Sequence, residues 1–168
     1  LRRVTLELGG KSAVLILDDA DIPAAVEALR LGALRNSGQV CSNKTRIIVS
    51  RRRQSELLEC LAAMMRAMPV GDPSDPATQI GPMVSRRQRE RVEGYITRGR
   101  EQGARLILGG GRSAGLDRGW FVEPTIFADV ERSMVIAQEE IFGPVLAVLP
   151  CADEGDAIAI ANDSPHGL

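Results

Sequence analysis

The chain contains few aromatic residues: Phe, Tyr and Trp together make up 3% of its 168 residues. Its core must therefore be built from Leu, Ile, Val, Ala and Met. Hydrophobic residues account for 44% and charged residues for 26%, which is the balance of an ordinary globular protein. No apolar run approaches the ~20 residues needed to span a bilayer, and no signal-peptide pattern opens the chain. These features predict a soluble protein of about one domain, without a membrane partner.

The charges of the chain nearly cancel. Lys and Arg number 21 and Asp and Glu number 22, so the formal net charge is -1. A protein that binds nucleic acid or an anionic membrane usually carries a basic excess. We therefore expect no nucleic-acid partner.

Cysteine and histidine are also scarce. Cys41, Cys60 and Cys151 are an odd number of cysteines, far apart and without a CxxC spacing. This pattern argues against a disulfide scaffold or a metal site and favours a reducing, cytoplasmic location. The only histidine, His166, is a poor candidate for the base of a cysteine-protease dyad.

Apolar runs at two different periods alternate along the chain. The pattern predicts six strands, at residues 4–8, 12–17, 45–49, 104–108, 121–130 and 145–149. Those at 12–17 and 104–108 are expected to be buried. The one at 121–130 contains Pro124 and is expected to be an edge or irregular strand. Four stretches have apolar residues at helical spacing. One follows a predicted N-cap at Asp21, one is the stripe from Leu57 to Met68, one follows a predicted capping box at Ser85–Gln88, and one is the segment 154–161. This alternation predicts the α/β class, with a mainly parallel, twisted sheet flanked by helices.

Cys41 lies in a Gly- and Asn-rich stretch between a predicted helix and a predicted strand, where loops often carry catalytic groups. Only a few per cent of a free thiol is ionised at neutral pH, but the thiolate is a strong nucleophile. Glu7 precedes the Gly9–Gly10 pair, and in an apolar strand it would be desolvated and suited to general-base work. A thiolate and such a carboxylate can form and hydrolyse a thioester. Taken singly, Cys41 is better explained as a buried core residue and Glu7 as a strand-edge charge.

Several motifs together resemble the aldehyde dehydrogenase superfamily. Leu6–Ser12 resembles its glutamate signature, and Gly38–Cys41 followed by Thr45–Arg46 resembles its cysteine signature. Further matching motifs occur in the family's order at Gly71–Pro73, Ile80–Pro82, Pro124–Thr125 and Glu139–Val145. The resemblance extends over nearly the whole chain.

The resemblance implies an NAD- or NADP-dependent enzyme that oxidises a small-molecule aldehyde. It implies that Cys41 attacks the aldehyde carbon to give a thiohemiacetal and then a thioester, and that Glu7 activates the hydrolytic water. Among the cofactor-binding residues, Glu140 would hydrogen-bond the nicotinamide ribose and Phe142 would pack beside it. The positions implied to border the nicotinamide are Leu8, Gly9 and Leu168.

The resemblance also implies a domain organisation. Residues 1–9 would end a cofactor-binding domain or hinge, and residues 10–168 would form a catalytic domain that is truncated at its C-terminal end. The chain is then expected to be a piece of a longer homo-oligomer and to be inactive by itself. His166 stands where the family usually has tyrosine.

Two alternatives remain open from the sequence. One is a relative that releases the thioester to coenzyme A, although such enzymes typically lack the base implied at Glu7. The other is a non-catalytic relative that keeps only the fold. Asn43, after Cys41–Ser42, resembles the betaine and amino-aldehyde branch of the family.

Overall fold

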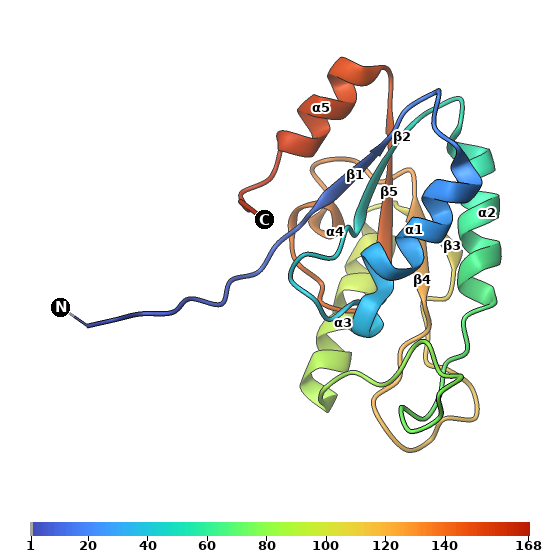
Figure 1. Ribbon diagram of the computed structural model, residues 1–168, viewed down its shortest axis with the longest axis vertical. Coiled ribbons are helices and arrows are strands. Elements are labelled where there is room, and N and C mark those ends of the chain that lie inside the picture. Colours follow the sequence, from blue (N-terminus) through green and yellow to red (C-terminus); the bar gives the residue numbers. More distant parts are fainter. Residues whose placement is uncertain (1) are drawn as a thin grey trace.

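The computed structural model describes residues 2–168, so residue 1 of the expected segment 1–9 lies outside the described residues. Strands and helices alternate along most of the chain, as the sequence predicts (Figure 1). The elements are β1 (Ala13–Ile16), α1 (Ile22–Leu34), η1 (Arg35–Gly38), β2 (Arg46–Ser50), α2 (Gln54–Arg66), α3 (Arg86–Glu101), β3 (Arg105–Leu108), β4 (Thr125–Ala128), α4 (Val135–Gln138), β5 (Val145–Cys151) and α5 (Glu154–Asn162).

The strands form one sheet in the order β1-β2-β5-β4-β3. The first three pairings, β1 with β2, β2 with β5 and β5 with β4, are parallel, and only β3 runs antiparallel to its neighbour β4. Parallel neighbours need crossover connections, which the intervening helices supply. The predicted mainly parallel α/β sheet is therefore confirmed.

Helices cover both faces of the sheet (Figure 1). Successive side chains of a strand point to opposite faces, so Ile47 and Val49 pack with α1 and α2, whereas Ile48 packs with α3, α4 and α5. β5 alternates in the same way. Two apolar layers result, built mainly from aliphatic side chains. No helix within residues 2–168 is both long and apolar enough to cross a membrane.

Three helices begin at the side-chain caps that their sequences supply. Asp21 accepts a hydrogen bond from the Ala24 N–H at 3.0 Å at the start of α1. Ser85 caps α3 and Asp153 caps α5 in the same way. Each cap satisfies one backbone donor that the first helical turn leaves without a partner.

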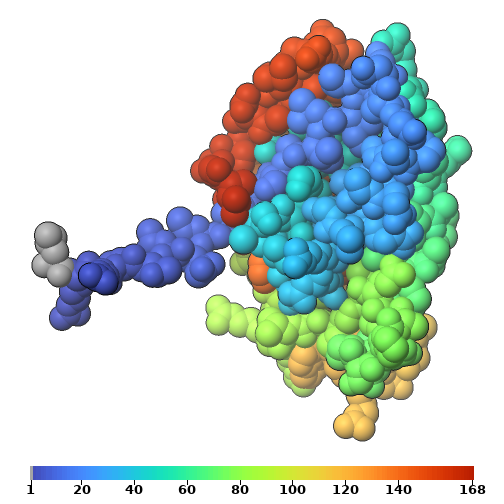
Figure 2. Space-filling view, viewed as in Figure 1, coloured from blue at the N-terminus to red at the C-terminus, as the bar shows by residue number. Residues whose placement is uncertain are grey.

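The predicted strand at residues 4–8 is wrong. Residues 2–9 form an exposed arm that projects from the body of the molecule (Figure 2), and Val4, Leu6 and Leu8 are each at least 70% exposed. No strand within residues 2–168 pairs with this arm. Local β-propensity cannot form a strand without a partner for its backbone.

Three other strand predictions need correction. The strand expected at 121–130 begins only at Thr125, directly after Pro124, and it lies inside the sheet with all four residues buried. Because Pro124 lies before the strand, its missing N–H removes no hydrogen bond from the sheet. The strands β1 and β3, predicted as buried, are the two edges of the sheet and are only partly covered.

A buried arginine joins two ends of the chain to the sheet. Arg46, at the start of β2, is 3% exposed, and its Nε donates to the Lys11 carbonyl at 2.8 Å. Its two Nη atoms donate to the carbonyls of Ile160 and Ala161, at 3.0 and 2.9 Å, at the end of α5. The Ala161 carbonyl has no backbone partner within residues 2–168, and the Ile160 carbonyl has only the Asp163 N–H at 3.3 Å. The negative end of the helix dipole also favours a cation there.

We expect Arg46→Lys to lower the free energy of unfolding by about 2–4 kcal/mol. A lysine ammonium lacks the planar fork that reaches three carbonyls, and each buried acceptor left unpaired costs about 1–3 kcal/mol. Chemical unfolding would measure the loss. Arg105→Lys, at an exposed ion pair with Asp129, is the matched control, with an expected change below about 1 kcal/mol. Equal losses in the two variants would contradict the prediction.

Candidate active site

Three segments that are distant in the sequence meet at one edge of the sheet. Residues 9–11 precede β1, residues 41–45 precede β2, and residues 139–144 precede β5. β1, β2 and β5 are neighbours and run parallel, so their amino ends lie side by side. The motifs that the sequence singled out are therefore brought together by strand order.

Cys41 lies on a tight turn between η1 and β2, and its side chain is partly exposed. Gly38, three residues earlier, has a φ of +79° and lies against the backbone of Gly143, so that a Cβ at Gly38 would overlap the Gly143 carbonyl. Only glycine satisfies both demands. After the cysteine, the buried amide of Asn43 donates to the Arg35 carbonyl at 3.1 Å and closes the loop.

The end of the N-terminal arm packs directly against this loop. A Cβ built at Gly10 would lie 2.6 Å from the carbonyl oxygen of Cys41 and 3.0 Å from that of Leu168. The Gly10 N–H donates to Oε1 of Glu140 at 3.2 Å, and Gly9 lies against the other oxygen of the same carboxylate. The Lys11 N–H donates to the Leu168 carbonyl at 3.2 Å. Gly10 thus contacts the backbone of Cys41, Leu168 and the carboxylate of Glu140, and Gly9 contacts the same carboxylate.

Helix α3 holds the segment that carries Glu140 and Phe142. The amide of Gln88 donates to the carbonyls of Ile141 and Phe142, at 3.1 and 2.7 Å. Arg91 donates to the Glu140 carbonyl at 2.8 Å. Phe142 has a φ of +60°, an uncommon value for a bulky residue that its surroundings must support.

The capping box expected at Ser85–Gln88 is only half correct. Ser85 caps the helix, but the Gln88 side chain binds the segment around Phe142 and not the Ser85 N–H.

A hollow of about 550 Å³ opens beside this segment. Glu140 and Phe142 line it from one side, and Gln88 and Arg91 line it from α3. An ionised carboxylate offers about four lone-pair sites, of which the Gly10 N–H takes one. Glu140 can therefore accept further hydrogen bonds from the hydroxyl groups of a ligand in the hollow.

Lys11 is a buried cation at the same edge of the sheet. Its side chain is 1% exposed, and its Nζ makes no hydrogen bond within residues 2–168. The pKa of Lys11 is lowered from 10.5 to about 7. Burial is the main cause and repulsion by Arg46 the second, while attraction to Glu140 and Glu139 partly opposes them.

The structure does not bring every expected site residue together. Glu7 and Leu8 are exposed on the arm, and the Glu7 carboxylate makes no hydrogen bond to the cluster around Cys41 within residues 2–168. The apolar, desolvating strand expected around Glu7 is not present there. Its carboxylate would have to approach through a movement of the arm.

Sequence reasoning missed the roles of Lys11 and Arg91, and it expected Gln88 only as part of a capping box. Lys11 stood within the glutamate signature, but a lysine seldom lies buried, so nothing marked it. Gln88 and Arg91 occupy a strongly polar helix, where single polar side chains carry no signal. Their spacing of three residues places both on one helix face, which is the only pattern that could have indicated them.

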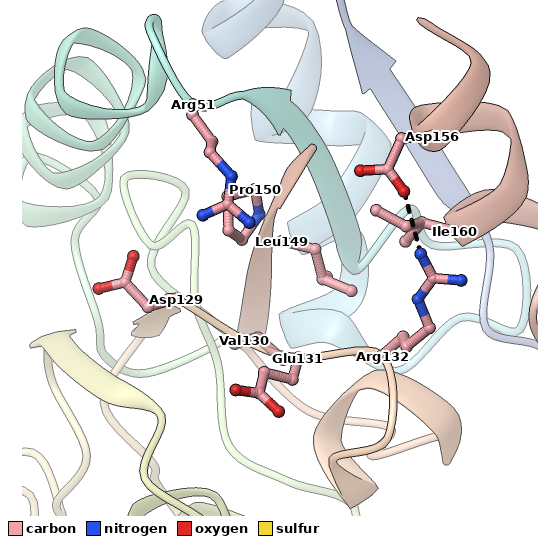
Figure 3. A pocket seen from close by; sticks show the side chains of 9 residues that line it. All are labelled: Arg51, Asp129, Val130, Glu131, Arg132, Leu149, Pro150, Asp156 and Ile160. Atoms are coloured by element: carbon pink, nitrogen blue, oxygen red, sulfur yellow. Dashed lines mark hydrogen bonds and ion pairs between the residues drawn. The ribbon is translucent and has the colours of Figure 1, made fainter. Parts of the chain in front are cut away.

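A second hollow, of about 470 Å³, lies at the opposite ends of the strands (Figure 3). Arg51 follows β2, Asp129 follows β4, and Arg132 forms an ion pair with Asp156 across the hollow at 3.0 Å. Acidic and basic side chains are mixed along its wall. It does not include Cys41 or Glu140 and is separate from the candidate active site.

The site thus combines a partly exposed thiol on a tight turn with a carboxylate, Glu140, that contacts the glycine pair packed against that turn, in a protein of the α/β class. Comparison with protein families matches residues 1–168 to the aldehyde dehydrogenase family. The chain belongs to this family.

Individual relatives agree with this assignment. A betaine aldehyde dehydrogenase of Brucella anthropi is 49% identical over 170 residues, covering 100% of this chain and 35% of the relative. A Mycobacterium tuberculosis aldehyde dehydrogenase complexed with NAD+ superposes with a TM-score of 0.94 at 57% identity, over 96% of this chain and 34% of that one. An aldehyde dehydrogenase C mutant from Pseudomonas syringae, complexed with NAD+ and octanal, gives a TM-score of 0.94 at 44% identity, over 98% and 34%. The chain spans about a third of the length of these proteins.

We expect the stability of the protein to rise with pH above about 7 because of Lys11. Unfolded, this lysine keeps its proton up to a pKa of about 10.5, whereas the folded state releases it near 7. Between these values the unfolded chain binds more protons, so the free energy of unfolding increases by up to about 1.4 kcal/mol per pH unit. Below about pH 7 both states are charged and the contribution no longer changes.

Chemical unfolding at pH 6, 8 and 9 would measure this slope. Lys11→Met should remove most of the rise, and Lys44→Met, at the exposed second lysine of the chain, should retain it. Parallel pH curves for the protein and Lys11→Met would refute the assignment.

Proposed function

We propose that this chain, within the complete protein, forms the catalytic part of an NAD(P)-dependent aldehyde dehydrogenase that converts an aldehyde to a carboxylic acid. The observation that carries the proposal is the packing of Gly10 against the Cys41 backbone, with Glu140 bound to the same Gly9–Gly10 pair. Membership in the family and the similarity to NAD+ complexes support it. Residues 1–9 would then link this part to a cofactor-binding domain.

In the first step the Cys41 thiolate attacks the aldehyde carbon, forming a C–S bond and an oxyanion. Within residues 2–168 the backbone N–H of Cys41 donates no hydrogen bond, so it is free to stabilise that oxyanion. The C–H bond then breaks with its electron pair leaving as hydride, and the oxyanion collapses to the carbonyl of a thioester.

Glu140, Phe142, Gly9, Leu8 and Leu168 are the residues that we assign to the nicotinamide half of the cofactor. The lone pairs left on the Glu140 carboxylate can accept hydrogen bonds from a pair of ribose hydroxyl groups. The hollow beside Phe142 is the space that the ribose would occupy. When bound, the nicotinamide accepts the hydride. These residues of the chain would hold the nicotinamide.

We assign to Glu7 the activation of the water that cleaves the thioester. Water adds to the carbonyl as its proton passes to the carboxylate, the C–S bond breaks, and the thiolate is restored. Glu7 lies on the exposed arm, two residues before Gly9, so this role requires the arm to move toward the Cys41 loop. Because the structure leaves Glu7 apart from Cys41, release to coenzyme A is the second candidate function.

All three cysteines are free thiols, which supports a reducing, cytoplasmic location for the protein. We further propose that the complete protein is a homo-oligomer.

Cys41→Ala in the complete protein should abolish aldehyde oxidation and the hydrolysis of activated esters, because no other group replaces the nucleophile. Spectrophotometric assays of NADH formation and of nitrophenol release would measure both. Cys60→Ala, at the other partly exposed cysteine, is the matched control and should keep activity. Substantial oxidation by Cys41→Ala would end the proposal.

Glu7→Gln should retain a rapid burst of NADH formation and slow steady-state turnover by roughly 10²-fold or more, because hydride transfer precedes the step that needs the base. Stopped-flow absorbance would resolve the two phases, and Glu59→Gln, at an exposed glutamate of α2, is the control. An unchanged steady-state rate, or acyl-coenzyme A as the main product when coenzyme A is added, would instead favour the second candidate.

A further inference from the structure

The turn before Cys41 contains three successive residues in the left-handed region. Their φ values are 52° at Asn36, 57° at Ser37 and 79° at Gly38. For a residue with a side chain this conformation costs about 1–2 kcal/mol, and it persists only where the surroundings hold it. The turn that delivers the thiol is therefore strained, and some contact must maintain it.

The Ser37 hydroxyl provides that contact. Ser37 is buried, and its Oγ accepts a hydrogen bond from the Gly81 N–H at 2.8 Å and donates to the Gly81 carbonyl at 3.1 Å. One hydroxyl thus satisfies both backbone groups of a residue 44 positions away. No other side chain within residues 2–168 binds the Gly81 backbone.

A second side chain supports the same junction. Oε1 of Gln39 accepts from the Val84 N–H at 2.9 Å, and its Nε2 donates to the Asn36 carbonyl at 3.3 Å. These bonds join the strained turn to the segment that leads into α3. The segment around Glu140 is held separately by Gln88 and Arg91, so the two halves of the site have different supports.

We infer that Ser37 is a positioning residue that fixes the sulfur of Cys41 for nucleophilic attack. This role rests on the proposed function, because it concerns the same thiol. Without the hydroxyl, both polar groups of Gly81 lose their partner, and the strained turn can relax. The attack by Cys41 would then slow, whereas cofactor binding would not change.

The test compares Ser37→Ala with Ser37→Gly in the complete protein. Alanine removes the hydroxyl and keeps the backbone strain, whereas glycine removes both. Asp153→Ala removes the N-cap of α5, a comparable loss of hydrogen bonding away from the turn, and serves as the control for general destabilisation. Three quantities are measured: the rate of Cys41 acylation by 4-nitrophenyl acetate, with Cys41→Ala as the blank; the dissociation constant for NAD+; and amide exchange in the peptides around residues 36–43 and 78–84.

Both Ser37 variants should acylate roughly tenfold more slowly than the unmodified protein, about the effect of losing one net hydrogen bond. Their dissociation constants for NAD+ should stay within about twofold, and exchange around Gly81 should accelerate. Asp153→Ala should match the unmodified protein in acylation and in exchange around Gly81.

An unchanged acylation rate in Ser37→Ala, full recovery in Ser37→Gly, or equal slowing in Asp153→Ala would each overturn the role of Ser37. Failure of the proposed function gives a different result. In that case the unmodified protein is acylated, and responds to Ser37→Ala as expected, but forms no NADH from any aldehyde.

Discussion

The position of the candidate site depends on the buried guanidinium of Arg46. Its three hydrogen bonds join the amino end of β2 to Lys11, which precedes β1, and to the last turn of α5. Leu168 follows that helix and returns to the Lys11 N–H. One buried side chain therefore joins two other segments to the start of β2, the strand that follows the Cys41 loop. Its planar shape matters as much as its charge, because a single ammonium could not reach all three carbonyls.

Around this junction, close contacts between backbone segments replace side-chain packing. Gly10 lies against Cys41 and Gly38 lies against Gly143, and any side chain at either glycine would separate the segments. The polar support comes instead from α3 and from Ser37. The strained turn and the buried Lys11 are both unfavourable locally, and such features persist at a site because the surrounding fold stabilises them.

The regular elements were largely predictable, and the errors have physical causes. The caps at Asp21 and Ser85 act locally, so the sequence located the starts of those helices correctly. The segment at residues 4–8 has strand-like composition, but a strand exists only where another strand accepts its hydrogen bonds. The four-residue helix α4 was not expected, because one turn is too short for a periodic pattern.

The sequence by itself determined the α/β class, and its motifs singled out Cys41 and, through the family resemblance, Glu140. It could not place these residues at one edge, because β5 lies next to β2 only after the helices between them have packed on both faces of the sheet. Nor could it show that Glu7 lies outside the cluster or that Ser37 holds Gly81. Strand order and long-range hydrogen bonds depend on which surfaces are buried together, and no local pattern contains that information.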